Sequence, residues 1–160
     1  MSEEEVSKET CYYAIAGGNS EIVRLCEQKG ISFEGCLNVS VSYHHFNLFE
    51  WLNQHFDFND ISLPDCIACD NEPIFYLHVS RGGNVEAKDK YENTPLICAS
   101  ENDNLDVVKY LVEQCHANVE AKNIDGYTPL IRASWNGHLD VVKYLVEQCH
   151  ANVEAKDNDG

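Results

Sequence analysis

The chain has 160 residues, 44% of them hydrophobic, a length and composition typical of one compact domain and incompatible with wholesale disorder. No apolar run approaches the roughly 20 residues that a membrane-spanning helix requires. The formal net charge is −16, from 27 acidic and 11 basic side chains, and this sign excludes nucleic acid and an anionic membrane surface from the partners that we expect.

Residues 1–10 form an acidic N-terminal segment that we expect to precede the folded part of the chain. The opening residues Met1 to Val6 lack the basic start and the apolar block of a secretory signal. The sequence therefore predicts residence in the cytoplasm, with the nucleus as an alternative. The eight cysteines are then expected to be thiols.

Cys66 and Cys69 have the spacing of half a zinc site or of a redox pair. A complete site would need a second Cys-x-x-Cys or a His pair at matching spacing, and none follows. We interpret these two residues as buried or incidental thiols, so no metal ligand is predicted here.

The C-terminal half contains an internal repeat. Thr94-Pro95-Leu96 recurs 34 residues later as Thr128-Pro129-Leu130, and Cys115-His116 recurs at the same spacing as Cys149-His150. The segment Asn118 to Lys122 recurs as 152–156 and has an earlier echo at 84–88. Residues 91–160 therefore hold two near-identical copies.

Each copy predicts a pair of helices followed by a turn. Thr128 can cap a helix through its hydroxyl, and Pro129 suits the first helical position because its missing N–H and fixed φ cost nothing there. After a break at Asn136 to His138, the segment 139–148 is amphipathic with a helical period. The stretch 123–126 carries the Asp-Gly signal of a tight turn, which predicts a projecting hairpin between helix pairs.

The stretch GYTPLIRASWNGHLDVVKYLVEQ, residues 126–148, resembles the ankyrin repeat in its Thr-Pro-Leu opening and its Gly-His-Leu-Asp-Val-Val centre. Weaker likenesses occur at 14–30, 46–56 and 74–89, and this divergent N-terminal half is similar to the lead-in of large ankyrin families in some unicellular eukaryotes. The resemblance implies an all-α solenoid over residues 11–160, divergent over 11–90, with projecting β-hairpin turns. We expect about five helix pairs, at 11–30, 36–57, 62–81, 94–115 and 128–149.

The chain departs from the family pattern at several positions. The usual His after Thr-Pro-Leu is Ile97 and Ile131 here, so its hydrogen bond toward the turn is missing. Glu92 and Asp103 stand where the second copy has glycines. If those positions need φ > 0, the first copy carries strain of about a kcal/mol that the second does not.

The resemblance implies non-catalytic recognition of a protein partner through a concave face made of turn residues and first-helix ends. The copies differ there, most visibly at Glu101, which is replaced by Trp135. Drift at exposed sites is the alternative explanation, but Tyr and Trp dominate interface energies, and we expect Tyr127 and Trp135 to anchor the partner. The carried-over binding residues are Lys90, Tyr91, Asn93, Glu101 and Asn102 in one copy and Ile124, Asp125, Tyr127, Trp135 and Asn136 in the other.

Two other kinds of function remain as alternatives: a structural spacer or regulatory arm of a longer chain, and a cysteine-dependent enzyme or metal protein. No motif of a serine hydrolase, zinc protease or phosphate-binding loop is present. The repeated Cys-His pairs would lie roughly 8 to 10 Å apart in stacked repeats, too far to share a zinc ion. We therefore expect no enzyme activity, no catalytic or metal-binding residue and no cofactor.

The printed sequence stops at Gly160, immediately before the position of another Thr-Pro-Leu. We expect the outer face of the last helix pair to be exposed and apolar, because terminal repeats normally need a polar cap. Self-association through this face, or further repeats in a longer parent chain, would cover it.

Overall fold

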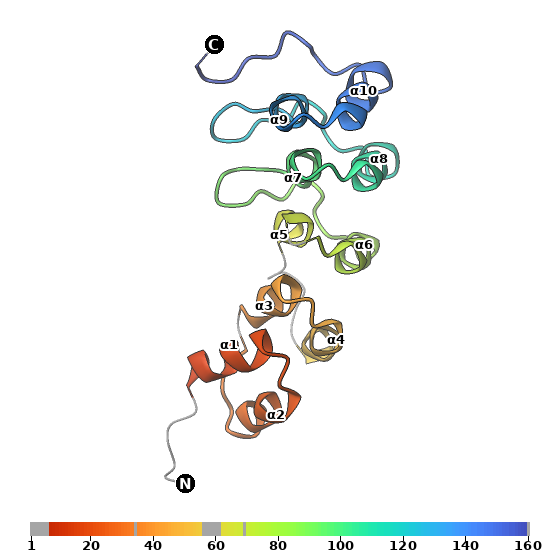
Figure 1. The fold of residues 1–160 in the computed structure, drawn as a ribbon. Helices are drawn as coiled ribbons and strands as arrows, with labels where there is room; N and C mark the ends of the chain where they lie inside the picture. Colours follow the sequence, from red (N-terminus) through yellow and green to blue (C-terminus); the bar gives the residue numbers. More distant parts are fainter. Residues whose placement is uncertain (1–6, 34, 56–61, 69, 160) are drawn as a thin grey trace. The chain divides into compact units, whose positions relative to one another are not determined.

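The computed structural model describes residues 7–33, 35–55, 62–68 and 70–159 of the chain (Figure 1). These ranges contain ten α-helices and no β-strand. In chain order the helices are α1 (Lys8–Ala16), α2 (Ser20–Gln28), α3 (Cys36–Ser42), α4 (Phe46–His55), α5 (Leu63–Ala68), α6 (Glu72–Ser80), α7 (Pro95–Glu101), α8 (Leu105–Glu113), α9 (Pro129–Asn136) and α10 (Leu139–Glu147).

The described helices form five consecutive pairs, so the all-α helix-pair prediction is confirmed. One boundary differs from the expected one, because α1 begins at Lys8 and not at Cys11. Ser7 and Thr10 form a capping box in which the Ser7 hydroxyl accepts from the Thr10 N–H at 3.3 Å. This local cap starts the helix inside the segment that sequence reasoning leaves unstructured.

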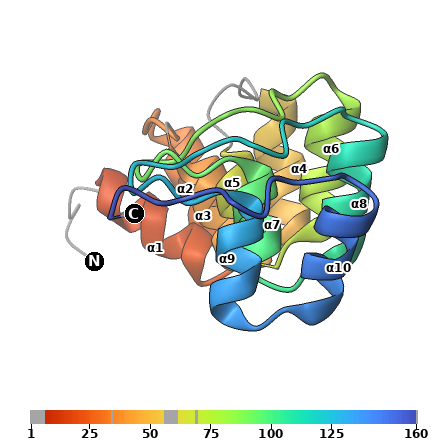
Figure 2. The same cartoon turned by 90° about the horizontal axis from the view of Figure 1, so that it is seen from above.

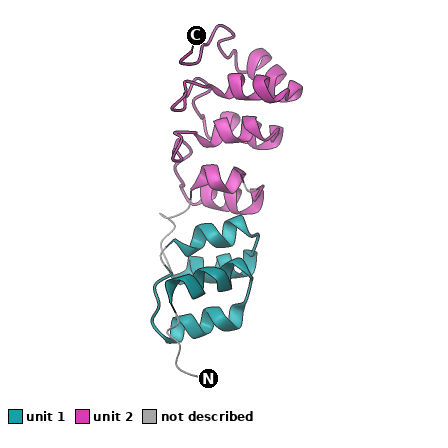
Figure 3. Ribbon diagram, turned by 60° about the vertical axis from the view of Figure 1, so that its left-hand side comes forward, with its two compact units in different colours: residues 1–61 teal, residues 62–160 magenta. Residues whose placement is uncertain are grey.

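The chain divides into two compact units, Met1–Ile61 and Ser62–Gly160 (Figure 3). The division at residues 90 and 91 marks the change from divergent to near-identical repeats and is a division of sequence, not of packing. Helix α5, whose sequence diverges from the repeats, belongs to the second unit because it packs against both α6 and α7.

In the first unit, α1 packs against α2 and α3, and α3 packs against α4. Large apolar side chains with no exposed surface, Ile15, Phe49 and Leu52, fill its core together with the thiols of Cys11 and Cys26. Burial of such side chains stabilises a fold by roughly 1.5–3 kcal/mol each, so this unit has a core of its own.

In the second unit the first helices α5, α7 and α9 stack in one layer, and α6, α8 and α10 form the second layer (Figures 1 and 2). Thr94 and Thr128 cap α7 and α9, accepting from the N–H groups of Ile97 and Ile131 at 3.4 and 3.2 Å. A proline follows each cap at the start of the helix, as predicted.

The loops between the helix pairs of the second unit project to the side of α7 and α9 that faces away from α8 and α10 (Figure 1). Each loop closes on itself through two backbone hydrogen bonds. In the first loop the Asp89 N–H donates to the Asn93 carbonyl at 3.1 Å and the Glu92 N–H to the Asp89 carbonyl at 3.0 Å, and in the second the Asn123 N–H donates to the Tyr127 carbonyl at 3.2 Å and the Gly126 N–H to the Asn123 carbonyl at 3.0 Å. Neighbouring loops are joined by the Ile124 N–H, which donates to the Tyr91 carbonyl at 3.0 Å. These are hairpin-like turns, too sparsely hydrogen-bonded to count as strands within the described ranges.

The backbone is left-handed at the two positions where the first copy has an acidic residue and the second copy has glycine. Glu92 and Asp103 have φ of 61° and 58°, and the equivalent Gly126 and Gly137 have φ of 82° and 78°. The prediction that the first copy carries non-glycine residues at positive φ is confirmed. His116, in the loop after α8, also has a positive φ of 55°.

We expect His116→Gly to raise the free energy of unfolding of the second unit by about 0.5–1 kcal/mol, because glycine relieves a left-handed conformation that costs an L-residue about 1–2 kcal/mol. His116 is exposed and has no hydrogen-bond or ion-pair partner among the described residues, so little else changes. Denaturant titration monitored by circular dichroism measures the gain.

The reciprocal control is Gly126→Ala. A Cβ at Gly126 would lie 2.6 Å from the Asn158 Oδ1 and 2.9 Å from its backbone nitrogen, in addition to the strain of a positive φ. This variant should lose more than about 1 kcal/mol. A His116→Gly protein that is less stable than the parent would contradict the strain argument.

Candidate functional site

The turns that carry the candidate binding residues are shaped by one side chain at the start of each loop. The Asp89 carboxylate accepts from the N–H groups of Tyr91 and Asn93, both at 2.8 Å. The Asn123 amide oxygen does the same for Asp125 at 3.1 Å and Tyr127 at 2.9 Å. Sequence reasoning did not single out these two residues, although Asp and Asn are known to organise turns in this way.

Asn93 is not available to a partner, contrary to the expectation that it lies on the binding face. Only 6% of its surface is exposed. Its amide donates to the Asp89 carboxylate at 3.0 Å, and its oxygen accepts from the Asn123 amide at 2.9 Å. Asn93 therefore joins one turn to the next and supports the surface from below.

Tyr127, Arg132 and Trp135 form a cluster at the base of the second turn, which we call the aromatic cluster. The ring centroids of Tyr127 and Trp135 are 6.3 Å apart, and the Arg132 guanidinium carbon lies 4.6 Å from the Tyr127 centroid. The cluster also contacts the first copy through an ion pair, in which Arg132 Nη1 is 3.6 Å from the Glu101 carboxylate. Trp135 has 76% of its surface exposed, so the indole is free to contact a partner.

Arg132 is the residue of this cluster that sequence reasoning left out of the binding set. The available signal was its difference from the neighbouring copy, which has Cys98 at the same position. Cys98 is buried, whereas Arg132 keeps 22% of its side chain exposed and reaches out to Tyr127. A buried slot in one copy therefore becomes part of the surface in the next.

Beside the aromatic cluster lies a hollow of about 460 Å³, which we call the acidic groove. Asp89, Glu101 and Asp125 bring three carboxylates to its lining, and Arg132 brings one cation. Five of the expected binding residues thus meet in one place, although one of them, Asn93, is almost fully buried. They are Tyr91, Asn93, Glu101, Asn102 and Asp125.

The remaining expected residues lie around this groove. Lys90 is exposed and its Nζ lies 4.8 Å from the Tyr91 ring centroid. Ile124 is 57% exposed at the tip of the next turn. Asn136 is exposed, and its amide donates to the Arg132 carbonyl at 3.1 Å, which completes the end of α9.

A histidine at the start of α10 fixes the first copy against the second. His138 Nε2 lies 2.8 Å from the Glu101 carbonyl and donates to it, and Nδ1 is 3.6 Å from the Asp103 carboxylate. The contact holds the end of α7, where Glu101 enters the groove. The sequence indicates that the hydrogen bond of the family's usual His is missing at Ile97 and Ile131, but it gives no sign that His138 supplies another bond between the helix pairs.

The outer face of α9 and α10 is exposed in the structure. A hollow of about 510 Å³ there is lined mainly by apolar side chains: Leu130, Ile131, Val142, Val146 and Val153, with Trp135 at its edge. Ser134 is exposed on this face, whereas the equivalent Ser100 is fully buried. The difference arises because α9 covers α7 and no further helix covers α9 in the structure.

Five of the cysteines favour the neutral thiol. Burial raises the pKa of Cys98 to about 12, with the Asp89 and Glu101 carboxylates adding to the effect. Burial also raises the pKa values of Cys11, Cys36, Cys115 and Cys149. A nucleophilic cysteine needs a lowered pKa, so none of these five has the character of one.

The structure describes only one residue of the Cys-x-x-Cys pair. Cys66 is fully buried, and Cys69 lies outside the described residues. Within the ranges that the structure describes, no group of three or more His, Cys, Asp or Glu side chains has a geometry that could hold a metal ion. In those same ranges no helix has both the length and the apolar character needed to cross a bilayer.

Comparison with protein families gives two matches. The family model described as "Ankyrin repeats (3 copies)" matches residues 66–157. The model described as "Domain of unknown function (DUF3447)" matches residues 2–78. A search of curated proteins returned no match to the chain.

Proposed function

Because the chain belongs to the ankyrin-repeat family, we propose that it is a non-catalytic scaffold that binds a protein partner through the aromatic cluster and the acidic groove. Ankyrin repeats are generally protein–protein interaction modules, and the family is typically non-enzymatic. The observation that carries the proposal is the 76% exposed indole of Trp135, set beside Tyr127 and Arg132. Trp, Tyr and Arg are the residues enriched at the energetic centres of interfaces.

The acidic groove supports a partner that presents a basic side chain. Three carboxylates and one guanidinium line the groove, so its own charge is negative, in agreement with the net charge of −16. A Lys or Arg of the partner would find carboxylate acceptors there, while an apolar neighbour would cover the Trp135 ring. The negative field of the whole chain would accelerate the encounter with such a partner.

Trp135 borders the uncovered hollow of α9 and α10, so a following repeat would reduce its exposure without burying it. The equivalent side chain in the first copy, that of Glu101, stays 37% exposed although α9 and α10 follow it. A partner can therefore reach this position in an internal repeat as well. This supports recognition over the spacer or regulatory-arm alternative, which requires no exposed aromatic cluster.

Proximity labelling in the source cell, followed by capture with the purified chain, would test the proposal. A partner that depends on the concave face is expected to be captured by the parent chain and lost with Tyr127→Ala combined with Trp135→Glu. Tyr13→Ala serves as the matched control, because Tyr13 is a 71% exposed aromatic residue on α1 in the other unit. Equal capture by all three proteins would refute the proposed surface.

The raised pKa of the Cys98 thiol argues against the cysteine-enzyme alternative and predicts how stability changes at alkaline pH. The fold favours the neutral thiol of Cys98, so its contribution to stability is complete below a pH of about 9 and is lost as the pH rises toward about 12. Between pH 7 and pH 10.5 the Cys98 thiol should lower the free energy of unfolding of the parent by on the order of 2 kcal/mol. The Cys98→Ala variant should lack this part of the loss. Denaturant titrations at pH 7 and pH 10.5 measure it, and a native-state thiol that reacts rapidly with a disulfide reagent at pH 7 would support the enzyme alternative.

Self-association is a second proposal, supported by the apolar hollow on the outer face of α9 and α10. Two copies that meet there would bury Ile131, Val142 and Val146. Sedimentation velocity over a range of concentrations should then show an oligomer that Val142→Glu abolishes. Residence in the cytoplasm or nucleus stays a prediction of the sequence.

A further inference from the structure

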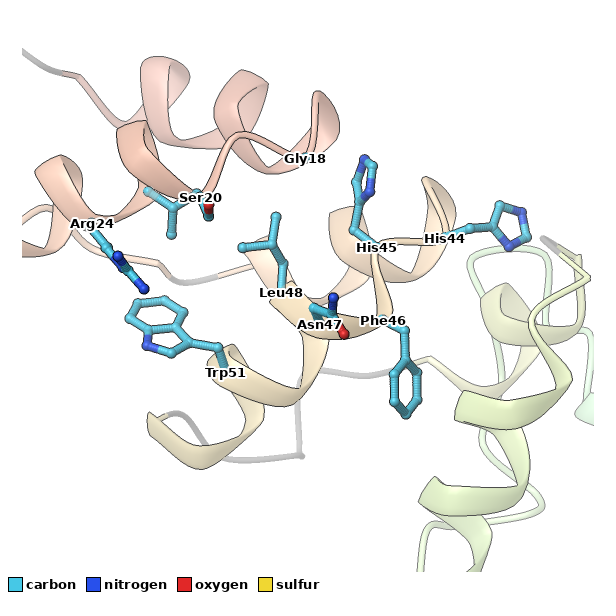
Figure 4. A pocket seen from close by; sticks show the side chains of 10 residues that line it. Gly18, Ser20, Arg24, His44, His45, Phe46, Asn47, Leu48 and Trp51 are labelled. Atoms are coloured by element: carbon cyan, nitrogen blue, oxygen red, sulfur yellow. The ribbon is translucent and has the colours of Figure 1, made fainter.

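A pocket of about 510 Å³ lies in the first unit, between α2 and the turn that joins α3 to α4 (Figure 4). Arg24 extends into it from α2, and Trp51 faces it from α4. The turn supplies His44 and His45, and the first turn of α4 supplies Phe46 and Asn47. None of these groups belongs to the surface proposed above.

The charge of this pocket is opposite to that of the chain as a whole. Its ten lining residues include one arginine and two histidines and no carboxylate, in a chain with 27 acidic side chains. Arg24 is exposed, and its guanidinium has no ion pair or hydrogen bond within the described ranges. An unpaired guanidinium in a pocket without acidic residues favours an anionic ligand.

The pocket is held in shape without a ligand. His45 Nε2 donates to the Ala16 carbonyl at 3.0 Å, and its ring lies so close to Gly18 that a Cβ there would be 2.7 Å from the imidazole. Trp51 packs edge-on against Phe33, with centroids 5.4 Å apart. Such fixed side chains lose little entropy on binding.

The pocket also has apolar side chains close to the Arg24 guanidinium. Val23 and Leu48 line the pocket and are 1% and 8% exposed. The Trp51 ring faces the Arg24 guanidinium, and Phe46 is 43% exposed at the other end of the pocket. The pocket therefore offers a carboxylate partner and an apolar contact within one hollow.

We propose that this pocket binds an acidic peptide segment, with an Asp or Glu carboxylate on Arg24 and an adjacent apolar side chain against Trp51. A carboxylate matches a single planar guanidinium, which can donate two parallel hydrogen bonds to it. A polyanion such as nucleic acid is disfavoured because the rest of the chain repels it. The site is independent of the aromatic cluster, because it lies in the other unit and selects the opposite charge.

Selection from a random heptapeptide phage library tests this proposal, using the full chain and its Arg24→Ala variant as targets. The net charge of the chain enriches basic peptides on both targets, so the comparison between targets is the readout. We expect peptides with Asp or Glu next to an apolar residue to be enriched on the parent and lost on Arg24→Ala. Trp135→Glu should retain the acidic peptides, which separates this site from the concave surface.

A selected acidic peptide, synthesised with blocked termini, should bind the parent at least tenfold more tightly than Arg24→Ala and tenfold more tightly than its own Glu→Gln version. Arg24→Lys should recover part of the affinity. Arg81→Ala, which removes an exposed arginine at the end of α6 in the other unit, should bind like the parent. Circular dichroism confirms that the variants are folded. Absence of acidic peptides from the selection, or equal affinity for Arg24→Ala, overturns the proposal.

Discussion

Trp135→Glu is expected to weaken capture of the protein partner at least tenfold, which corresponds to about 1.4 kcal/mol. The indole is 76% exposed, and its ring centroid lies 6.3 Å from that of Tyr127. Truncation of an aromatic residue at the centre of a contact typically costs about 2 kcal/mol or more. A titration of the captured partner against parent and variant, by surface plasmon resonance or calorimetry, measures the loss.

The same substitution should leave the melting temperature within about a degree of the parent. Exposed substitutions usually change stability by less than about 0.5 kcal/mol, and the first copy already has Glu101 at this position. Tyr13→Ala again serves as the control for loss of an exposed aromatic residue. An unfolded variant would show that Trp135 stabilises the core, and a folded variant with full affinity would show that it is a neutral surface residue.

The helices of the second unit were predictable because their signals are local. Thr94 and Thr128 with their following prolines, and the glycine at 137, specify helix ends through contacts with residues only a few positions away. The positive φ of Glu92 followed from comparison of the two copies. The cap of α1 at Ser7 is also local, and its Thr at the third position was simply a less familiar partner than Glu or Gln.

The candidate site was predictable only in outline, because its details depend on neighbouring repeats. Whether Asn93 faces a partner or the next turn depends on Asn123, which is 30 residues away. The hydrogen bond from His138 to the Glu101 carbonyl also joins residues that are 37 positions apart, so helical periodicity cannot predict it. Arg132 faces outward only because Tyr127 and Glu101 provide contacts for its guanidinium.

The pocket around Arg24 could not be inferred from composition, because net charge averages over the whole surface. A charge of −16 predicts repulsion of anions at long range. It says nothing about a hollow whose ten lining residues come from Gly18 and α2, from the turn after α3 and from α4 and include no carboxylate. At contact distance the local groups decide which ligand binds, since salt screens charges beyond roughly 10 Å.

The stacking of the repeats predicts that one substitution has two different effects in the two copies. Ile97 is fully buried beneath α9, whereas the equivalent Ile131 is partly exposed and borders the outer hollow. Ile97→Ala should therefore lower the free energy of unfolding by about 2–5 kcal/mol, and Ile131→Ala by less than about 1.5 kcal/mol. Native-state hydrogen exchange read over α7 to α10 measures both losses without assuming that the two units unfold together.

An added repeat supplies the decisive control. Both substitutions place the same residue in the same helical position, so their intrinsic helix propensities cancel and the difference reports burial alone. Appending a further copy of residues 127–160 after Gly160 should cover Ile131 as α9 covers Ile97, because stability in a solenoid depends on contacts between nearest neighbours. In the extended chain Ile131→Ala should then become as costly as Ile97→Ala. Equal losses in the chain without the added repeat would mean that the outer face of α9 and α10 is already covered in solution, which would favour self-association.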